Sequence, residues 1–293
     1  MLEFENLSLS HGDFVRPFLE KGRTGLCDPT MGGVMMWRNH FHTQLAYDGD
    51  CLYFRCPISS EHLVYTPPIG DLAHGVEAIV AQETASGRDA VFFSVGEEDR
   101  ASILALLPDY VAEPQRDSFD YVYLKEKMIS FSGKKLSGQR NHRNYFLNHF
   151  PNWHFEEITA DNLPLAKELF AQVLSEQPKE DPSFLSEKEA VLEVMDHPEV
   201  YRFFGGMVFA EEKPVAFSYG EIIGDMMFVH IEKALRSVRG AYQMMTSSFL
   251  SRFAREDTVY VNREEDMGDP GLRYSKTAYH PEMMLKKYVL HKK

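Results

Sequence analysis

Two spacings of hydrophobic residues divide the second half of the chain into helices and strands. Over 163–174 the apolar residues recur at three- and four-residue intervals, which predicts an amphipathic helix with Pro164 in its first turn. A second helix is predicted over 184–196, because Pro198 disfavours helical backbone at the residue before it. Both helices precede a region in which the spacing changes.

Three β-rich runs follow, separated by short turn-forming segments. They lie at 200–210, 214–223 and 226–233, and their close spacing predicts an antiparallel meander. In the third strand, alternation places Phe228, His230 and Glu232 on one face. The remaining predicted elements are a helix over 239–255, a strand over 257–263, a short helix over 270–279 and a final strand near 285–291.

The first half contains an echo of the second. Residues 89–98 align without a gap to residues 257–266, and in each copy an apolar run ends in acids. The identical pairs are Asp89 and Asp257, Val91 and Val259, and Glu97 and Glu265. The match is short, but each copy also follows a predicted helix, at 74–86 and 239–255, and precedes another. The matching order favours an internal repeat.

The order of predicted elements in the second half is the plan of the GNAT acyltransferase fold. The echo then predicts an α/β (α+β) protein with a tandem GNAT-like acyl-CoA N-acyltransferase fold, built from two mostly antiparallel mixed sheets flanked by helices. We expect a degraded N-terminal copy over 1–118 and a C-terminal domain over 119–293 that carries the active cleft. The segment 115–125 is the predicted junction, and the chain is predicted to become helical from about 133.

Composition fits two folded domains and limits the possible partners. The chain has 293 residues, 44% hydrophobic and 26% charged, with a net charge of −13. This charge disfavours a general coat for nucleic acid or membranes, because its field repels phosphates. No uncharged stretch approaches the ~20 apolar residues of a membrane span, and the acidic N-terminus lacks the features of a secretory signal. We expect a cytoplasmic protein.

Three cysteines are too few for a disulfide framework in a chain of this length. Cys27, Cys51 and Cys56 are predicted to be buried free thiols, which fits a reducing compartment. Cysteine and histidine are also zinc ligands, so His40 and His42 offer an alternative metal site with them. The spacing of Cys51 and Cys56 is wider than a zinc knuckle, and we expect no metal.

Two motifs carry a family resemblance. They are Phe131-Ser132-Gly133-Lys134-Lys135-Leu136 with Arg140-Asn141-His142, and Asn262-Arg263-Glu264-Glu265-Asp266-Met267-Gly268 with Gly271-Leu272-Arg273, Lys276 and Tyr279-His280-Pro281. Together with Met36-Trp37-Arg38, they resemble an uncharacterised bacterial family similar to the C-terminal synthase domain of phosphatidylglycerol lysyltransferases and, more distantly, to Fem-type peptidoglycan aminoacyltransferases. The resemblance implies tandem GNAT-like domains and transfer of an aminoacyl or acyl group. Characterised relatives take that group from aminoacyl-tRNA.

The segment before the 239–255 helix is the candidate donor-binding loop. In GNAT enzymes a Gln/Arg-x-x-Gly-x-Gly/Ala signature receives the pyrophosphate of coenzyme A at a helix N-terminus. With Gly240 as the first glycine, Ser237 and Tyr242 depart from it; with Arg236 as the start, Arg239 replaces the glycine. We take Arg236, Ser237, Arg239 and Gly240 as candidate contacts to phosphate, from coenzyme A or an RNA end; a solvated helix entry is the alternative. No tightly bound cofactor is expected.

An acid-rich turn follows the 257–263 strand, where open α/β sheets place ligands. Its acids are Glu264, Glu265, Asp266 and Asp269, which are able to accept a proton from an attacking amine or to bind a cationic substrate. Glu265 and Asp266 are the candidate catalytic residues. Arg273 and Lys276 lie three residues apart on the next helix and, with Asn262, are candidate substrate contacts. The alternative is an ion-pair cluster that ties helix to strand.

Three further residues are candidates for proton transfer. His230 and Glu232, near the expected acyl site, are each a candidate base. Tyr279 is a candidate proton donor to the leaving group. The alternative for His230 and Tyr279 is a structural role in packing.

The segment 125–143 is basic although the chain is acidic. It has six lysines and arginines against one acid, with aromatic residues interleaved, as in surfaces that contact phosphate or RNA. Lys134, Lys135, Arg140 and His142 are the candidate substrate contacts, and a solvated helix is the alternative.

These features predict an acyl or aminoacyl transferase. The donor is aminoacyl-tRNA or an acyl-CoA thioester, the acceptor is an amine or hydroxyl, and attack is direct, because no motif for a covalent intermediate is evident. Two alternatives stay open: a non-catalytic GNAT-like binding module, and an acetyl-CoA-dependent N-acetyltransferase of small molecules.

Overall fold

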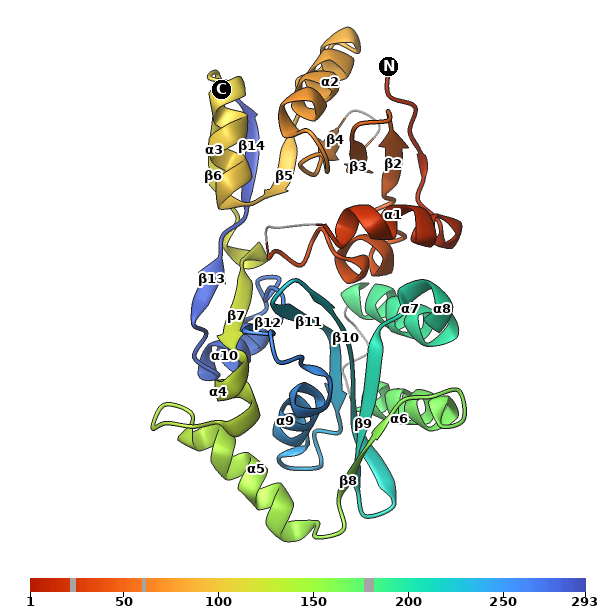
Figure 1. The fold of residues 1–293 in the computed structure, drawn as a ribbon, viewed down its shortest axis with the longest axis vertical. Coiled ribbons are helices and arrows are strands. Elements are labelled where there is room, and N and C mark those ends of the chain that lie inside the picture. Colours follow the sequence, from red (N-terminus) through yellow and green to blue (C-terminus); the bar gives the residue numbers. More distant parts are fainter. Residues whose placement is uncertain (22–24, 60–61, 177–181) are drawn as a thin grey trace. The chain divides into compact units, whose positions relative to one another are not determined.

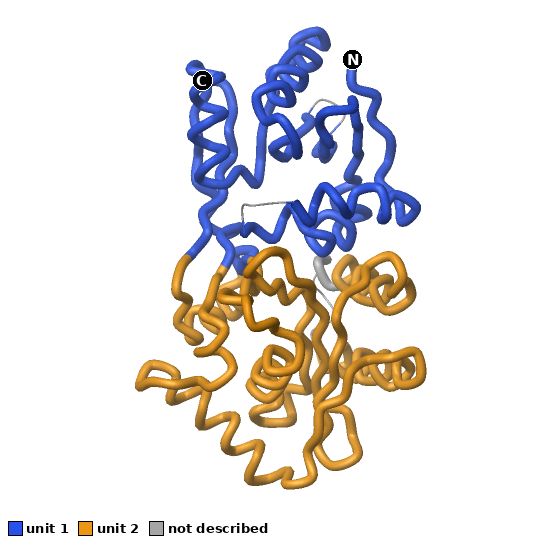
Figure 2. The backbone as a smooth tube through the Cα atoms, viewed as in Figure 1, with its two compact units in different colours: residues 1–120, 265–268, 284–293 blue, residues 121–264, 269–283 orange. Residues whose placement is uncertain are grey.

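In the computed structural model, the described residues are 1–21, 25–59, 62–176 and 182–293. They form two compact units (Figure 2). Unit 1 comprises Met1–Asp120, Glu265–Gly268 and Met284–Lys293, and unit 2 comprises Tyr121–Glu264 and Asp269–Met283. The sequence predicted a single boundary at 118/119, whereas two segments near the C-terminus join the N-terminal unit.

Unit 1 is a seven-stranded mixed sheet with helices. Its strands are β1 (Glu5–Asn6), β2 (Gln44–Tyr47), β3 (Leu52–Pro57), β4 (Leu63–Tyr65), β5 (Phe92–Val95), β6 (Tyr110–Pro114) and β14 (Tyr288–Lys292). Its helices are α1 (Gly12–Leu19), α2 (Leu72–Ala85) and α3 (Glu97–Leu106), with short helical turns at Leu9–His11, Gly32–Met36 and Arg116–Ser118. The strand order is β1-β2-β3-β4-β5-β14-β6, and β4 and β5 are parallel.

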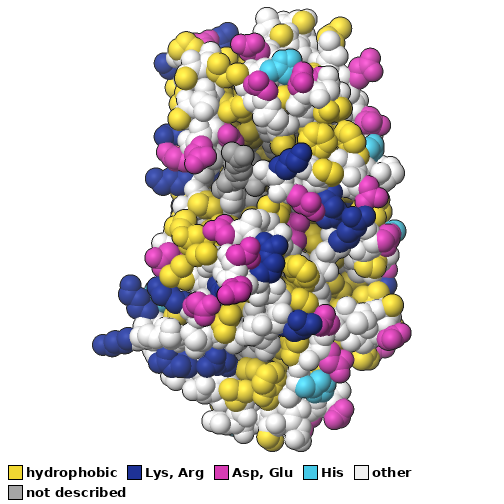
Figure 3. All heavy atoms as spheres, viewed as in Figure 1, with side chains coloured by type: hydrophobic (Ala, Val, Ile, Leu, Met, Phe, Trp, Pro, Cys, Tyr) yellow, Lys and Arg dark blue, Asp and Glu magenta, His cyan; other side chains and the backbone are white. Residues whose placement is uncertain are grey.

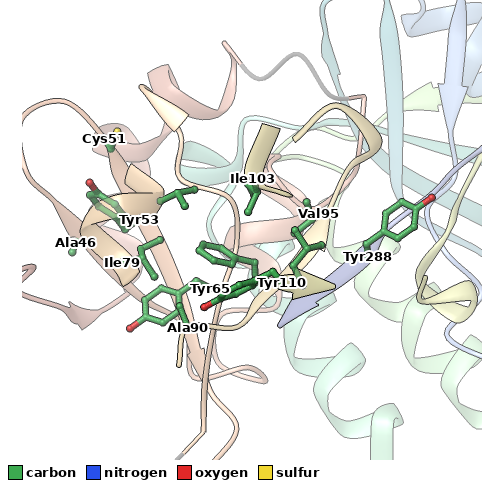
Figure 4. Packing of buried hydrophobic residues seen from close by; sticks show 13 residues of the cluster. Ala46, Cys51, Tyr53, Tyr65, Ile79, Ala90, Val95, Ile103, Tyr110 and Tyr288 are labelled. Carbon is green, nitrogen blue, oxygen red and sulfur yellow. The ribbon is translucent and has the colours of Figure 1, made fainter. Parts of the chain in front are cut away.

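The core of unit 1 is made by α2, α3 and one face of the sheet. Tyr65 on β4 and Phe92 on β5 are fully buried and pack with Val76 and Ile79 of α2. Figure 4 shows this cluster extending to Tyr288 on β14. Asp71 caps α2 by accepting hydrogen bonds from two first-turn amides, which explains where the helix begins.

Unit 2 contains the second seven-stranded sheet. Its strands are β7 (Asp120–Leu124), β8 (His154–Glu157), β9 (Phe204–Ala210), β10 (Lys213–Ile223), β11 (Met226–Ala234), β12 (Tyr260–Asn262) and β13 (Met283–Leu285). Its helices are α4 (Lys125–Ser130), α5 (Ser137–His149), α6 (Leu163–Ser175), α7 (Pro182–Asp196), α8 (Pro198–Tyr201), α9 (Ala241–Phe253) and α10 (Pro270–Ala278). The order β13-β7-β12-β11-β10-β9-β8 places α9 on one face and α6 on the other (Figure 1).

The two sheets repeat one plan. In each, an antiparallel meander is followed by a helix and then by a strand parallel to the last meander strand: β4, α2 and β5 in unit 1, and β11, α9 and β12 in unit 2. The predicted internal repeat and the tandem GNAT-like α/β fold are therefore confirmed. The strand predicted over 200–210 is wrong at its start, where α8 replaces it.

Each sheet also contains a strand from the other half of the chain. The strand β14 lies between β5 and β6 in unit 1, and β7 lies between β12 and β13 in unit 2. The two strands hold the same place in the repeated order. The final predicted strand thus exists, but it completes the N-terminal sheet.

Candidate functional site

The parallel strands β11 and β12 of unit 2 pair over three residues and then diverge. Their last pair is Phe228 with Asn262. Beyond it, β11 stays with β10 to Ala234, whereas the chain after β12 pairs with Tyr121: the Arg263 amide donates to the Tyr121 carbonyl at 3.0 Å. Diverging strands expose backbone and side chains that a continuous ladder would cover, so this point is the candidate active site.

A β-bulge at the divergence decides which side chains face which way. Tyr219 of β10 pairs with Ile231, and Gly220 pairs with Val229, so His230 is the extra residue of β11. A Cβ on Gly220 would lie 3.4 Å from Phe249 of α9, which identifies this face as the α9 face.

His230 and Glu232 therefore lie on opposite faces, and the prediction that they share one is wrong. His230 bonds to Glu221, the neighbour of Gly220 on the other face, whereas Glu232 accepts from Thr246 of α9 at 3.0 Å. The bulge adds one residue and shifts the alternation. Bulges of this kind often redirect a side chain next to an active site.

His230 is held between two carboxylates. Its Nδ1 lies 2.7 Å from Glu264 Oε1 and its Nε2 lies 2.9 Å from Glu221 Oε1. Burial alone would lower the pKa of His230, but hydrogen bonds to Glu221 and Glu264 outweigh it and raise the pKa to about 9. The ring is therefore an imidazolium at neutral pH, which disfavours His230 as the base that receives a proton.

Glu264 is the more exposed of the two carboxylates. Its side chain is 19% exposed, against 10% for Glu221 and 0% for His230. Glu264 also has a positive φ of 60°, and its amide donates to the buried Asn262 side chain at 2.7 Å. The left-handed backbone of a non-glycine residue is costly and is fixed here by neighbouring contacts.

A second polar network surrounds Arg263. The guanidinium donates to Glu232 at 2.7 Å and lies 4.6 Å from the centre of the Tyr279 ring. Gln243 of α9 donates to the Tyr279 hydroxyl at 3.1 Å, and Lys276 of α10 donates to the Arg263 carbonyl at 2.6 Å. These contacts link β11, β12, α9 and α10.

Burial fixes the protonation state of Tyr279. The residue is 4% exposed, and burial raises the pKa of its hydroxyl, so it stays protonated at neutral pH. Of the other predicted contacts on this side, Lys276 is buried, and Arg273 on α10 is partly exposed.

Glu265 and Asp266 are placed in unit 1. Asp266 is fully buried, pairs with Arg116 at 3.1 Å and accepts the Gly268 amide at 2.9 Å. Glu265 lies 3.4 Å from Lys287. Within the acid-rich turn, Glu264 therefore contacts His230, whereas Glu265 and Asp266 contact side chains of unit 1.

Lys287 lies at the centre of a buried cluster in unit 1. Its ammonium, 1% exposed, lies 2.5 Å from Asp28, 2.7 Å from Asp120 and 3.3 Å from Cys27 Sγ. Cys27, Asp28 and Asp120 are close enough to hold a metal ion, but the lysine supplies the positive charge among them. All three cysteines are buried and free.

The predicted basic contacts lie around α4 and α5. Lys134 and Lys135 are exposed in the connection between these helices, where Figure 3 shows lysine and arginine side chains gathered at the lower left. Arg140 donates to the carbonyls of Phe131 and Gly133, at 2.6 and 3.0 Å, and so fixes the connection. His142 is half-buried on α5.

The candidate donor loop precedes α9. The Arg236 amide and the Ser237 hydroxyl both donate to Glu176, at 2.7 and 2.8 Å. Arg239 lies 4.4 Å from the centre of the Tyr145 ring. Gly240 is the N-cap of α9, with a φ of 88° that favours glycine.

The family described as "Phosphatidylglycerol lysyltransferase, C-terminal" matches residues 23–291. The chain belongs to this family. Its fold is similar to that of a conserved protein of unknown function from Bacteroides thetaiotaomicron, with a TM-score of 0.91 and 30% identity over the whole of both chains. It is also similar to L-PGS from Bacillus licheniformis, with a TM-score of 0.65 and 15% identity over 96% of this chain and 91% of that one.

A sequence relative is an uncharacterized protein of Mycoplasmoides gallisepticum. It is 24% identical over 178 residues, which are 59% of this chain and 56% of the relative's length. Family membership associates the chain with transferases. No helix among the described residues is both long and apolar enough to cross a membrane.

Sequence reasoning missed two residues of the site, Glu221 and Arg263, and it included Glu264 only as one of the acids of the turn. Arg263 and Glu264 stand in the recognised motif, but their neighbours were preferred for the chemistry. Strand alternation from Asn262 would have separated Glu264 from Glu265. Glu221 had no such signal, because its contact to His230 depends on the cross-strand register.

Proposed function

We propose that the chain is an aminoacyl or acyl transferase whose reaction takes place where β11 and β12 diverge. The observation that carries the proposal is the position of Glu221, His230 and Glu264 at this divergence. Family membership supports transfer of an acyl-type group, and the family's description names a lysyl group. The donor we favour is aminoacyl-tRNA, and the acceptor is an amine or a hydroxyl.

Glu264 is the group we assign to receive the acceptor's proton. It is the more exposed carboxylate of the pair that contacts His230, and a carboxylate accepts a proton as the acceptor attacks the carbonyl. His230 is a positioning residue, because both of its ring nitrogens are engaged and its side chain is fully buried. It fixes the direction of Glu264 and neutralises part of the local negative charge.

The charge of this group favours a cationic aminoacyl substrate. Two carboxylates around one imidazolium leave a net negative charge, which attracts the ammonium of an aminoacyl ester. Arg263, held by Glu232 and Tyr279 on the α9 face, is a positioning residue that ties the end of β12 to β11.

The proposed step is a direct attack. The acceptor nitrogen or oxygen forms a bond to the donor carbonyl carbon, and the bond from that carbon to the ribose oxygen of the tRNA breaks. One proton leaves the acceptor for Glu264, and Glu264 returns this proton to the departing ribose oxygen, so the carboxylate is regenerated. Exposed Lys134 and Lys135 offer positive charge for the RNA.

The test is transfer of labelled lysine or alanine from charged tRNA to a panel of acceptors. The panel contains phosphatidylglycerol vesicles, amines and amino-sugar peptides, and parallel reactions use acetyl-CoA. We expect the wild type to transfer from charged tRNA and Glu264→Gln to be at least ~100-fold slower, which is the usual contribution of a general base. Glu256→Gln, an exposed acid before the same strand, is the control.

Three outcomes would contradict the proposal. Transfer from acetyl-CoA alone would favour the small-molecule N-acetyltransferase. Binding of charged tRNA without transfer across the panel would favour a non-catalytic binding module. An unchanged rate in Glu264→Gln, with a folded protein, would remove Glu264 from the reaction.

A further inference from the structure

Glu176 places a carboxylate on the loop where a GNAT fold would receive a diphosphate. The loop joins β11 to α9, and the Arg236 amide and the Ser237 hydroxyl are donors on this loop, ahead of Gly240, the N-cap of α9. Both are already engaged: the Arg236 amide donates to Glu176 Oε2 at 2.7 Å and the Ser237 hydroxyl donates to Oε1 at 2.8 Å. Each carboxylate oxygen therefore has one short, charge-assisted hydrogen bond.

The helix before Glu176 fixes where the carboxylate lies. Glu176 is the C-cap of α6, and its amide donates to the Val173 carbonyl at 3.2 Å. α6 is anchored by four buried residues and packs on β10 and β11. The four buried residues of α6 are Ala166, Leu169, Phe170 and Val173. The carboxylate is thus delivered to the loop by a packed element of the same unit.

The other side of the loop is covered by α5. A Cβ on Gly240 would lie 2.3 Å from the His142 carbonyl, so the backbones approach closely there. Arg239 lies over the Tyr145 ring of α5, at 4.4 Å. The head of α9 is therefore packed against the protein's own backbone on one side and bonded to its own carboxylate on the other.

The geometry points to Glu176 as a determinant of donor specificity: it excludes donors that carry a diphosphate at this loop, such as coenzyme A thioesters. A diphosphate bound at this loop would compete with Glu176 for the Arg236 amide and the Ser237 hydroxyl, and it would meet a like charge at the same atoms. Because Glu176 is exposed, solvent weakens the repulsion, and the exclusion acts mainly by competition for the donors. The inference rests on the proposed function and limits its donor to one without that diphosphate.

The experiment measures ligand affinity by isothermal titration calorimetry, without turnover. The probes are coenzyme A, inorganic pyrophosphate and pantetheine, which lacks the diphosphate. The proteins are the wild type, Glu176→Ala, Glu176→Gln and the control Glu168→Ala, which removes an exposed acid from the same helix. Melting curves check that each variant is folded.

We expect Glu176→Ala to bind coenzyme A and pyrophosphate at least tenfold more tightly than the wild type. Glu176→Gln should gain less, because the amide still occupies the loop, and Glu168→Ala and all pantetheine titrations should show no gain. Wild-type affinity for coenzyme A equal to that of Glu176→Ala would overturn the inference, as would a folded Glu176→Ala that gains no affinity. Loss of transfer in every assay would instead count against the proposed function.

Discussion

The ion pairs around His230 predict a specific dependence of stability on pH. His230 has a pKa raised to about 9 in the folded protein, against about 6.5 in an unfolded chain. A group whose pKa is raised on folding contributes stability that is fully present below the unfolded pKa. That stability is lost as the pH rises through the folded pKa, here between about pH 6.5 and about pH 9.

The magnitude follows from the difference between the two pKa values. About 2.5 pH units at 1.36 kcal/mol each correspond to about 3 kcal/mol of the free energy of unfolding of unit 2. Wild-type protein should lose this amount between pH 6.5 and pH 9.5. In His230→Gln the ionisable ring is absent, so the same interval should change the stability by less than about 1 kcal/mol.

Urea unfolding followed by tryptophan fluorescence measures this. Trp37 lies in unit 1 and Trp153 in unit 2, so a Trp37→Phe background makes the signal report unit 2. His74 and His291 also have raised pKa values, but they lie in unit 1. Hydrogen bonds to Asp48 and to the Lys292 carbonyl raise these two. Fluorescence from Trp153 alone therefore separates the effect of His230 from theirs.

Equal pH slopes in the wild type and His230→Gln would refute the reasoning. That result would mean that the imidazolium is not stabilised by Glu221 and Glu264 in solution. A stability loss that appears only below pH 6 in the wild type would have the same meaning, because it would place the titration of the ring in the wrong direction.

Three further predictions concern other parts of the chain. Gly240→Ala should destabilise unit 2 by at least about 1 kcal/mol, measured by the urea midpoint, because its φ of 88° disfavours a side chain and the new Cβ would meet the His142 carbonyl; an unchanged midpoint would contradict the close approach. Lys287→Met should destabilise unit 1 by about 3–5 kcal/mol, followed by Trp37 fluorescence, since it leaves buried carboxylates unpaired, and adding Asp120→Asn should restore part of the loss. Burial raises the pKa of the Cys27 thiol, so Cys27 should not react with a thiol reagent in the native protein and should react once urea unfolds it. Rapid labelling of Cys27 in the native protein, assigned by mass spectrometry, would be inconsistent with its burial.

Periodicity predicted most elements but not the sheet that each strand joins. The helices near α2, α6 and α9 and the parallel strands β5 and β12 follow from local spacing. The positions of β14 between β5 and β6 and of β7 between β12 and β13 do not follow from local spacing, because the alternation of a strand carries no information on its partner. The boundary at 118/119 was therefore drawn along the chain, while the units are assembled from separated segments.

The sequence indicated which segments carry the candidate site but not which of their side chains meet there. The bulge at His230 moved Glu232 to the other face, and no hydrophobic pattern marks a single inserted residue. Glu264 and Glu265 are chemically alike in the sequence, and they separate only when β12 ends and its backbone pairs with Tyr121. Such choices depend on hydrogen bonds between distant segments.

The sequence echo itself distinguishes scaffold from chemistry. One of its two identical acid pairs, Glu97 and Glu265, contacts the beginning of the C-terminal strand β14: Glu97 accepts from the Tyr288 hydroxyl at 2.7 Å, and Glu265 lies 3.4 Å from Lys287. This shared acid is therefore used to hold a strand in unit 1. The residue that bonds to His230 is not shared, because Glu264 aligns with Gly96. A repeat conserves what the fold needs twice, so the chemistry of this chain is to be sought at the positions where its two halves differ.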